Sequence, residues 1–535
     1  MPQNRALQTD DHTAAPGARR KNYGRLRAGS LILIHLLIAA HIVHWRLAGR
    51  TLAPLELNEV MYTLELGIVT AGFLLMAGVT LSVFLFGRFF CSWGCHVLAL
   101  QDLCAWLLAR AGIRPKPVRS RALMLVPVGV MGLMFVWPQV KRLLAGEPFP
   151  NWRIMTPSDP WSSYLTDDFW RNLPGPWIAG LTLLICGFAT VYLLGSRSFC
   201  RYGCPYGVLF AFADRFAPGR IVARGDCSGC GACTAACQSH VRVHSELTVF
   251  GRVVDPGCLK DLDCVAACPN GEIAYGLAKP SFFASWKRGA IHRPAPDYSL
   301  GEECAAAAVV IATVLVFRGL YDAVPLLMSV GLGMVFAWTA VMTCRVLRAP
   351  NVRLLQFQLK RNGAQSRAGI IFLAGALVVA VFFVHSASIR VRERLGERAL
   401  REGAALIEAG RPEAARRHLA SALGHFTACD RLGLVRSDLL LTRLASLHEW
   451  SETPERSEPY LRELIDRQPN APEPRLRLAA LLAHTSRPEQ ARLEVAAIRS
   501  LSGFDQSLRS DIDQRLDDIE AVLEFNRSDR VIRQP

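Results

Sequence analysis

The chain has 535 residues, of which 51% are hydrophobic, and a mean hydropathy of +0.22. These values predict two or more domains and exclude an ordinary soluble protein of this size. The formal net charge is +16, but no basic–aromatic stripe or nucleic-acid motif accompanies it, so we expect no nucleic-acid partner. The 16 cysteines are clustered, which indicates metal or redox chemistry in a reducing compartment instead of a secreted disulfide scaffold.

Residues 1–27 are polar and basic near their end, and we expect them to be disordered. Beyond them, about seven apolar runs are long enough to predict membrane-spanning helices, at 28–47, 65–86, 121–138, 176–195, 303–320, 324–343 and 369–387. The first run is too long for a signal peptide and lacks a clear small-residue cleavage site, so a retained helix is predicted. The run at 303–320 is short and Ala-rich, and is the weakest of the seven.

The distribution of Lys and Arg predicts how these helices are oriented. The amino-terminal tail and the connections between runs two and three and between runs six and seven are basic. The connections at 49–64 and 139–175 are acidic or balanced. The positive-inside rule therefore predicts a multi-pass protein of the bacterial inner membrane, with its amino terminus and the segment after run four in the cytoplasm. After seven spans, the carboxyl-terminal region is expected in the periplasm.

The segment between runs four and five carries the cysteine pattern of a two-cluster bacterial ferredoxin. Its first half reads C-x2-C-x2-C-x3-C, and its second half ends in Cys268-Pro269. Two intervening residues let successive thiolates reach one small volume, whereas the fourth cysteine reaches the neighbouring cluster. Zinc does not call for seven cysteines in this pattern. The spacing predicts a [4Fe-4S] cluster held by Cys227, Cys230, Cys233 and Cys268, and a second cluster held by Cys258, Cys264 and Cys237.

Asp261 stands where the second half should carry its own second cysteine. Its carboxylate could bind the fourth iron weakly and complete a [4Fe-4S] cluster. It could also be absent from the site and leave a [3Fe-4S] cluster, or be a solvated acid. The spacing does not choose among these alternatives, but it predicts that the second cluster is the labile one.

Two C-x3-C motifs follow the second and fourth runs. Cys91 and Cys95 form the first motif, Cys200 and Cys204 form the second, and both read Phe-Cys-x-aromatic-Gly-Cys. The chain therefore contains a duplicated unit of two spans. A spacing of four places both sulfurs of a pair on one helix face. If the units pack side by side, four thiolates meet at the membrane surface and can hold a third metal centre or cluster, or act as redox-active dithiols. The alternative is structural, with small cysteines at a tight helix entry.

Three histidines lie near the predicted outer ends of apolar runs. They are His41 and His44 in the first run and His385 in the seventh. Ionisable groups in a span are costly and are functional candidates by default. A quinol site needs such a proton acceptor near the membrane surface, and a haem needs a helical histidine. The alternative is that these histidines face lipid headgroups.

The region 389–535 is rich in Leu, Ala, Arg and Glu at helical spacing and contains a weak internal repeat. Residues 406–416 resemble residues 482–492, an offset equal to about two tetratricopeptide units. We expect a stacked helix-pair array with a concave partner-binding face. A plain helical bundle is the alternative.

Together these motifs resemble the membrane polyferredoxin family. Its members include the membrane ferredoxin subunit serving periplasmic nitrate reductase, the membrane part of the nitrous-oxide-reductase regulator and the cytochrome-oxidase accessory polyferredoxin. The resemblance covers about residues 28–345 and rests on both C-x3-C motifs and the ferredoxin cysteines. It implies electron transfer between a quinone pool or cytoplasmic donor and a redox partner. His96 departs from the family, because it replaces the usual proline after the first motif, and so do Asp261 and the carboxyl-terminal repeats.

The expected fold is mainly α, with polytopic membrane helices, an inserted α+β ferredoxin domain and a carboxyl-terminal tetratricopeptide-like domain. The expected boundaries are 1–27 for the tail, 28–200 for four spans, 201–300 for the cytoplasmic iron–sulfur domain, 301–388 for three spans and 389–535 for the repeats. The expected function is that of an electron carrier or oxidoreductase subunit. The alternatives are a redox-sensing or metalloenzyme-assembly protein that recruits a client, and a metal-ion reductase.

Overall fold

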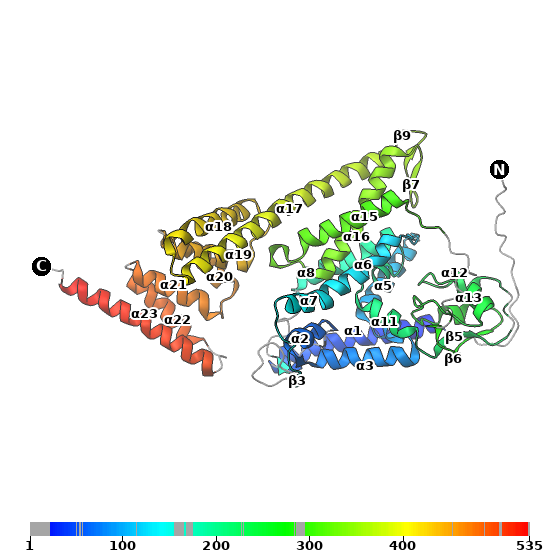
Figure 1. The fold of residues 1–535 in the computed structure, drawn as a ribbon, viewed down its shortest axis with the longest axis horizontal. Coiled ribbons are helices and arrows are strands. Elements are labelled where there is room, and N and C mark those ends of the chain that lie inside the picture. The colour runs from blue at the N-terminus through cyan, green and yellow to red at the C-terminus, as the bar shows by residue number, and fades with distance from the viewer. Residues whose placement is uncertain are drawn as a thin grey trace. The chain divides into compact units, whose positions relative to one another are not determined.

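The computed structural model describes residues 22–532 apart from 50, 53–54, 56, 114, 155–164, 167–174, 226, 228, 283, 285–294, 452, 486 and 502–505. Most of the expected basic tail therefore lies outside the described residues. The chain forms two compact units (Figure 1). Met1–Leu315 and Pro325–Leu377 make up the first unit, and Val316–Val324 and Val378–Pro535 make up the second.

The expected mainly helical membrane fold is confirmed. Six helical stretches of the described chain are long and apolar enough to cross a membrane. They are α1 (Tyr23–Ala48), α6 to α7 (Arg121–Met131 and Trp137–Leu144), α8 to α9 (Pro176–Thr182 and Thr190–Leu194), α15 (Leu300–Phe317), α16 (Leu326–Arg348) and α17 (Arg367–Glu408). Short π-helical turns, Gly132–Val136 and Leu183–Ala189, join the two interrupted stretches.

The second expected span differs from the prediction of one helix over 65–86. It consists of α2 (Val60–Leu66), the short strand β2 (Ile68–Val69) and the 16-residue apolar helix α3 (Ala71–Phe86). Gly67 ends α2 with a φ of 72°, and a Cβ there would lie 2.3 Å from the carbonyl oxygen of Asn151. Thr70 then starts α3 by accepting a hydrogen bond from the Phe73 amide. The close approach at Gly67 breaks the helix, which hydropathy alone does not reveal.

The start of α1 also differs from the sequence expectation. The helix begins at Tyr23, so the last five residues of the expected tail are helical. Asn22 caps it through its side chain, which accepts a hydrogen bond from the Arg25 amide. Arg27 is buried because it forms ion pairs with Asp102 and Asp263.

Short elements connect the spans of the first unit. Two small sheets pair β1 (Thr51–Leu52) with β4 (Leu165–Thr166) and β2 with β3 (Arg153–Ile154). The helices between spans are α4 (Phe89–Trp93), α5 (His96–Arg110), α10 (Ser198–Tyr202) and α11 (Tyr206–Asp214). A three-stranded sheet of β7 (Val352–Leu354), β8 (Phe357–Arg361) and β9 (Ala364–Gln365) joins α16 to α17.

The ferredoxin segment is a small insert closed by one antiparallel strand pair. The strand β5 (Gly219–Ala223) pairs with β6 (Ile273–Leu277), with Gly219 opposite Leu277. Between them lie α12 (Ala232–Ala235), α13 (Val243–Phe250) and α14 (Asp263–Ala267). The insert sits beyond one end of α1 and α3 (Figure 1). The strand pair therefore returns the chain to the place where it left the helices.

The second unit contains the part of α17 from Val378 on and the helices that follow it. They are α18 (Pro412–Leu432), α19 (Asp438–Glu449), α20 (Glu458–Arg467), α21 (Pro472–His484), α22 (Pro488–Ser500) and α23 (Gln506–Ile532). The two sequence repeats adopt the same turn. The Arg411 and Arg487 amides donate to the carbonyls five residues earlier, at 2.9 and 3.0 Å, and a proline then starts the next helix. The tetratricopeptide architecture itself stays a prediction.

Glu303 on α15 joins two helices of the membrane core. Its carboxylate accepts hydrogen bonds from the Ser120 hydroxyl at 2.6 Å and from the Arg121 and Ala122 amides at 2.8 Å. These amides belong to the amino-terminal turn of α6, where a negative charge also opposes the helix dipole. The side chain of Glu303 is buried. If its carboxylate were lost, no water would be present to accept the hydrogen bonds of these three donors.

We predict that Glu303→Gln lowers the free energy of unfolding by about 2 kcal/mol, because an amide presents a donor where three donors converge. Thermal unfolding of the full chain in detergent measures the change. Glu302→Gln is the control, since Glu302 is partly exposed and pairs with Arg345. An equal effect of both substitutions would contradict the importance of the Glu303 contacts.

Candidate iron–sulfur and thiol site

Four ferredoxin cysteines line one small hollow at the surface of the insert. They are Cys227, Cys230, Cys233 and Cys268, the same four that the spacing assigns to the first cluster. Gly229 and Gly231 adopt φ values of 69° and 78°, which lets the backbone wrap closely around the hollow. Cys230 is exposed, so this site opens to the aqueous side.

Cys237, Cys258 and Cys264 gather at a second place, deeper in the insert. All three are buried and belong to one packed cluster. Burial raises the pKa of the Cys237 thiol to about 12, and the charges of Asp261 and Cys258 add to this shift. Burial also raises the pKa of Cys264, with further contributions from Cys258, Asp261 and Cys237. Asp261 therefore lies beside the three thiols, where the spacing predicts the fourth ligand position.

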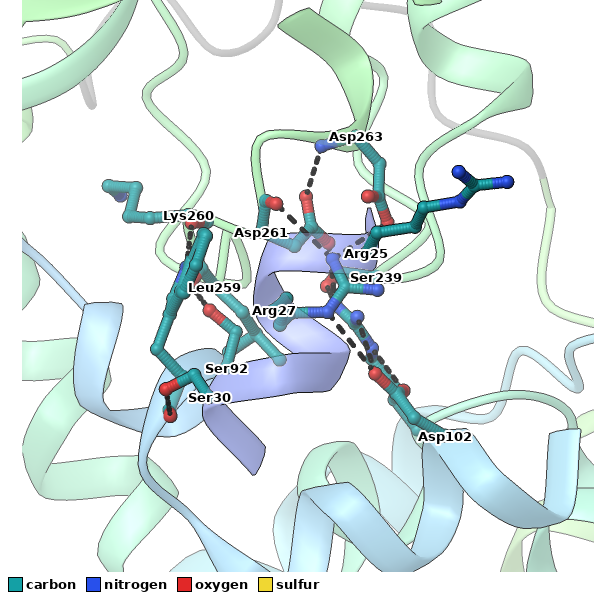
Figure 2. Close-up of polar contacts among 12 residues, drawn as sticks. Arg25, Arg27, Ser30, Ser92, Asp102, Ser239, Leu259, Lys260, Asp261 and Asp263 are labelled. Carbon is teal, nitrogen blue, oxygen red and sulfur yellow. Dashed lines mark hydrogen bonds and ion pairs between the residues drawn. The ribbon is translucent and has the colours of Figure 1, made fainter. Parts of the chain in front are cut away.

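Asp261 is not a solvated acid, because its relative exposure is only 4%. One carboxylate oxygen lies 2.5 Å from a guanidinium nitrogen of Arg197. The other faces the Asp263 amide at 3.4 Å, and Arg27 donates to the Asp261 carbonyl at 3.2 Å. Figure 2 shows Arg27 on α1 reaching toward the insert loop that carries Asp261 and Asp263.

The four cysteines of the C-x3-C motifs come together in the described chain. Cys91, Cys95 and Cys200 pack against the same buried leucines, Leu31, Leu98 and Leu259. Burial raises the pKa of Cys200 well above its usual range, and Cys95, Cys204 and Cys91 raise it further. Burial likewise raises the pKa of Cys204 to about 12, with contributions from Cys95 and Cys91. The duplicated units therefore bring their cysteines close together, and a shared metal centre there stays a prediction.

The loop of the second site rests directly on the first C-x3-C turn. Ser92 and Trp93, which lie between Cys91 and Cys95, donate hydrogen bonds to two consecutive carbonyls of this loop. The distances are 2.7 Å to the Leu259 oxygen and 3.1 Å to the Lys260 oxygen (Figure 2). Cys258 immediately precedes these two residues. Side-chain hydrogen bonds to backbone carbonyls thus join the second cysteine site to the third.

Arg88 and Arg197 are site residues that the motif analysis missed. Each lies three residues before the first cysteine of its motif, and that shared position in the two repeats is the signal that could have identified them. Arg88 donates to the Pro256 carbonyl at 2.9 Å. Arg197 binds Asp261, the Ser239 hydroxyl at 3.1 Å and the Asp102 carboxylate at 3.3 Å. Both arginines are buried, and both reach from the membrane unit into the insert.

Asp214 forms a second buried contact of the same kind. Its carboxylate lies 2.8 Å from Arg220 and 2.8 Å from Lys260, and none of the three side chains has measurable exposure. The Arg88 amide also approaches it at 3.3 Å. A carboxylate at the end of α11 therefore holds both the first strand of the insert and the loop after Cys258.

The hydrogen-bond partners found for the candidate histidines do not include these cysteines. His41 Nε2 pairs with the Leu52 carbonyl and His44 Nδ1 with the Thr51 hydroxyl, both at 2.9 Å, so both histidines hold β1. His385 Nε2 is buried without a hydrogen-bond partner in the described chain. Nearer the thiols, burial lowers the pKa of His96, and His35 lowers it further, so these two rings are neighbours.

The donor set suits iron–sulfur clusters. Buried thiols with raised pKa values are unstable as free thiolates, and metal coordination is what stabilises that form. Among the described residues, no group of three or more His, Cys, Asp or Glu side chains is arranged around a point that fits one metal ion. Cluster-binding thiolates each bind a separate iron, so they do not need to converge on one point.

Comparison with known families gives the same chemistry. A family described as a 4Fe-4S binding domain matches residues 68–114 and 176–223, which contain the two C-x3-C motifs. This likeness supports a polyferredoxin-type family for the chain. The matched segments end before Cys227, so the family likeness concerns the duplicated membrane unit as well as iron–sulfur binding.

Three relatives are similar to part of this chain. The methylamine utilization ferredoxin-type protein MauN of Methylobacillus flagellatus is 27% identical over 177 residues, which cover 32% of this chain and 54% of MauN. The putative electron transport protein YccM of Escherichia coli is 27% identical over 218 residues, covering 39% and 56%. MauN of Methylorubrum extorquens is 26% identical over 188 residues, covering 34% and 59%. The chain spans little more than half the length of each relative, and no solved structure matches it.

His240, three residues after Cys237, predicts a pH dependence. Burial, followed by the charges of Arg201, Arg197 and Arg119, lowers its pKa from 6.5 to about 4. The folded state therefore favours the neutral ring, whereas the unfolded chain binds a proton as the pH falls below 6.5. Stability contributed by this group is present above pH 6.5 and is lost between about 6.5 and 4.

We predict that the His240→Asn variant loses less stability than the wild type as the pH falls through this range, by on the order of 1–2 kcal/mol. Asparagine does not titrate, and it tolerates the positive φ of this position. Thermal midpoints of the wild type and the variant, measured from pH 4.5 to 7.5, give the difference. Parallel pH curves for the two proteins would contradict the assignment.

Proposed function

We propose that the chain is an integral membrane electron-transfer protein in which three cysteine sites form one route. The observation that carries the proposal is the contact between Ser92–Trp93 and Leu259–Lys260. It joins the second ferredoxin site to the C-x3-C centre without an intervening layer of protein. Iron–sulfur clusters supply one-electron chemistry when bound at such sites.

The burial of the cysteines supports an order for this route. Cys230 is exposed in the first site, whereas all three cysteines of the second site are buried. Cys233 of the first site packs in the same cluster as Cys237, Cys258 and Cys264. The second site therefore stands between an aqueous entry point and the membrane centre. In this proposal each of the three cysteine groups holds one iron–sulfur cluster. Cys91, Cys95, Cys200 and Cys204 form the third group.

The distribution of Lys and Arg in the connecting segments predicts the orientation of the chain in the membrane. The basic connections predict that the insert is cytoplasmic and that the second unit is periplasmic. The exposed first site would then accept or donate electrons on the cytoplasmic side. The names of two relatives, a ferredoxin-type protein and a putative electron transport protein, support this role.

A second candidate function is that of an accessory protein that recruits a client. The observation that favours it is the repeated helix–proline–helix turn at Arg411–Pro412 and Arg487–Pro488. Stacked helix pairs commonly present a surface for another protein. In this alternative the clusters report redox state and the second unit holds the client, such as a metalloenzyme under maturation.

Iron content tests the third site. We predict that replacing Cys200 and Cys204 together by serine lowers the iron of the anaerobically purified full chain by about four atoms, because the shared centre loses half its ligands. The electron paramagnetic resonance (EPR) signal of the first cluster should persist. Cys104→Ser is the control, since Cys104 is buried beside Gly187 and belongs to neither C-x3-C motif. Unchanged iron in the double variant, or stoichiometric zinc in the wild type, would contradict the proposal.

Reoxidation separates the two candidate functions. We predict that the dithionite-reduced protein in lipid nanodiscs is rapidly reoxidised by a short-chain quinone, as measured from the visible absorbance. The Cys200→Ser/Cys204→Ser variant should lose this rapid phase, because the route ends before the membrane centre. A wild type that stays reduced with quinones but is reoxidised by cupric ion would favour a metal-ion reductase. One that stays reduced with both would favour the accessory role.

A further inference from the structure

Arg197 competes with iron for the carboxylate of Asp261. The carboxylate lies at the fourth ligand position of the second site, yet one of its oxygens is 2.5 Å from the Arg197 guanidinium. The other oxygen faces the Asp263 amide. Both carboxylate oxygens are therefore already engaged within the protein, and Arg27 holds the backbone of the same residue through its carbonyl.

The position of Arg197 is set by the membrane unit and not by the insert. Arg197 precedes α10, the helix that carries Cys200, and adopts a φ of 56°. It pairs with Asp102 on α5 through a second nitrogen, and its side chain is 3% exposed. Asp102 also pairs with Arg27 at 3.4 Å. The guanidinium is thus fixed between two carboxylates and cannot follow Asp261 toward the thiols.

The chemistry of the two partners favours arginine. A charge-assisted pair between arginine and a carboxylate is strong when it is buried, and breaking it leaves an unpaired buried charge. Iron in a sulfide cluster prefers soft thiolate ligands, for which a hard carboxylate oxygen is a poor substitute. Binding of the Asp261 carboxylate to iron therefore contributes less free energy than is lost when its ion pair with Arg197 breaks.

We propose that Arg197 withholds Asp261 from iron, so that the second site carries a three-iron cluster held by Cys237, Cys258 and Cys264. This inference rests on the proposed iron–sulfur function. It makes the composition of the second cluster depend on the docking of the insert on the C-x3-C unit, because docking is what places Arg197 against Asp261.

The duplicated unit supplies a matched control. Arg88 occupies the position of Arg197 in the first repeat, is equally buried and also contacts the loop of the second site. Its guanidinium binds the Pro256 carbonyl and its backbone amide approaches Asp214, so neither contact involves Asp261. A substitution there removes a buried arginine beside the same loop and leaves the Arg197–Asp261 pair in place.

The experiment follows the second cluster by EPR in the full chain, purified anaerobically in detergent. The sample is treated with ferrous ion and dithionite. One electron reduces the oxidised three-iron cluster, and one Fe²⁺ then enters to give a four-iron cluster, provided that a fourth protein ligand is free. After excess iron is removed and the sample is mildly reoxidised, the three-iron signal measures what was not converted.

The wild type and Arg88→Gln should both retain the three-iron signal after this treatment. Arg197→Gln should lose it, because the freed carboxylate can complete the four-iron site. Asp261→Cys should show no three-iron signal from the start, since it supplies a thiolate. Should Arg197→Gln fail to bind any cluster, Arg197→Lys replaces it. Lysine keeps the charge without the two-pronged geometry, so the signal should fall in part.

Two results would overturn the inference while leaving the proposed function intact. One is a wild type with two ordinary four-iron clusters and no three-iron signal. The other is an Arg197 variant that resists conversion as the wild type does while its first cluster remains normal. Absence of the first cluster, held by Cys227, Cys230, Cys233 and Cys268, would instead contradict the proposed function itself.

Discussion

Buried charges hold the iron–sulfur insert on the membrane helices. Asp214, Arg220 and Lys260 are fully buried, and Asp261 and Arg197 nearly so. A buried charge is tolerated only when a partner of opposite sign is fixed beside it. Lys260 and Asp261 lie in the insert loop, whereas their partners Asp214 and Arg197 come from the helical segments before it, so these two pairs form only when helices and insert are assembled together. The alignment of the cysteine sites depends on that assembly.

The duplication explains why the insert has two such anchors. Each repeat contributes an arginine before its C-x3-C motif, and the two arginines grip opposite ends of one loop, at Pro256 and at Asp261. The repeats have diverged in what they bind. On this loop, Arg88 binds the backbone carbonyl of Pro256, whereas Arg197 binds the side chain of Asp261. A symmetric membrane unit thereby holds an asymmetric insert in a single orientation.

Much of the site could be predicted from local spacing, and what could not depends on contacts distant in sequence. Cysteine spacing identified the four residues that line the first hollow, because they lie within one tight loop apart from Cys268. Hydropathy located the apolar segments but missed the break at Gly67, which the Asn151 backbone imposes from far along the chain. The partner of Asp261 was equally out of reach, since 64 residues separate it from Arg197. Solvent exposure was therefore a reasonable alternative for this acid until the fold was known.

The first C-x3-C turn contacts the loop after Cys258 through carbonyl oxygens, at Leu259 and Lys260. Every residue type has a backbone carbonyl, so this contact does not restrict which side chains the loop carries. Evolution can therefore change a ligand on this loop without dissolving the junction between the two redox sites. Asp261 is an instance of that freedom: a ligand position altered in chemistry within a connection that stays mechanically the same.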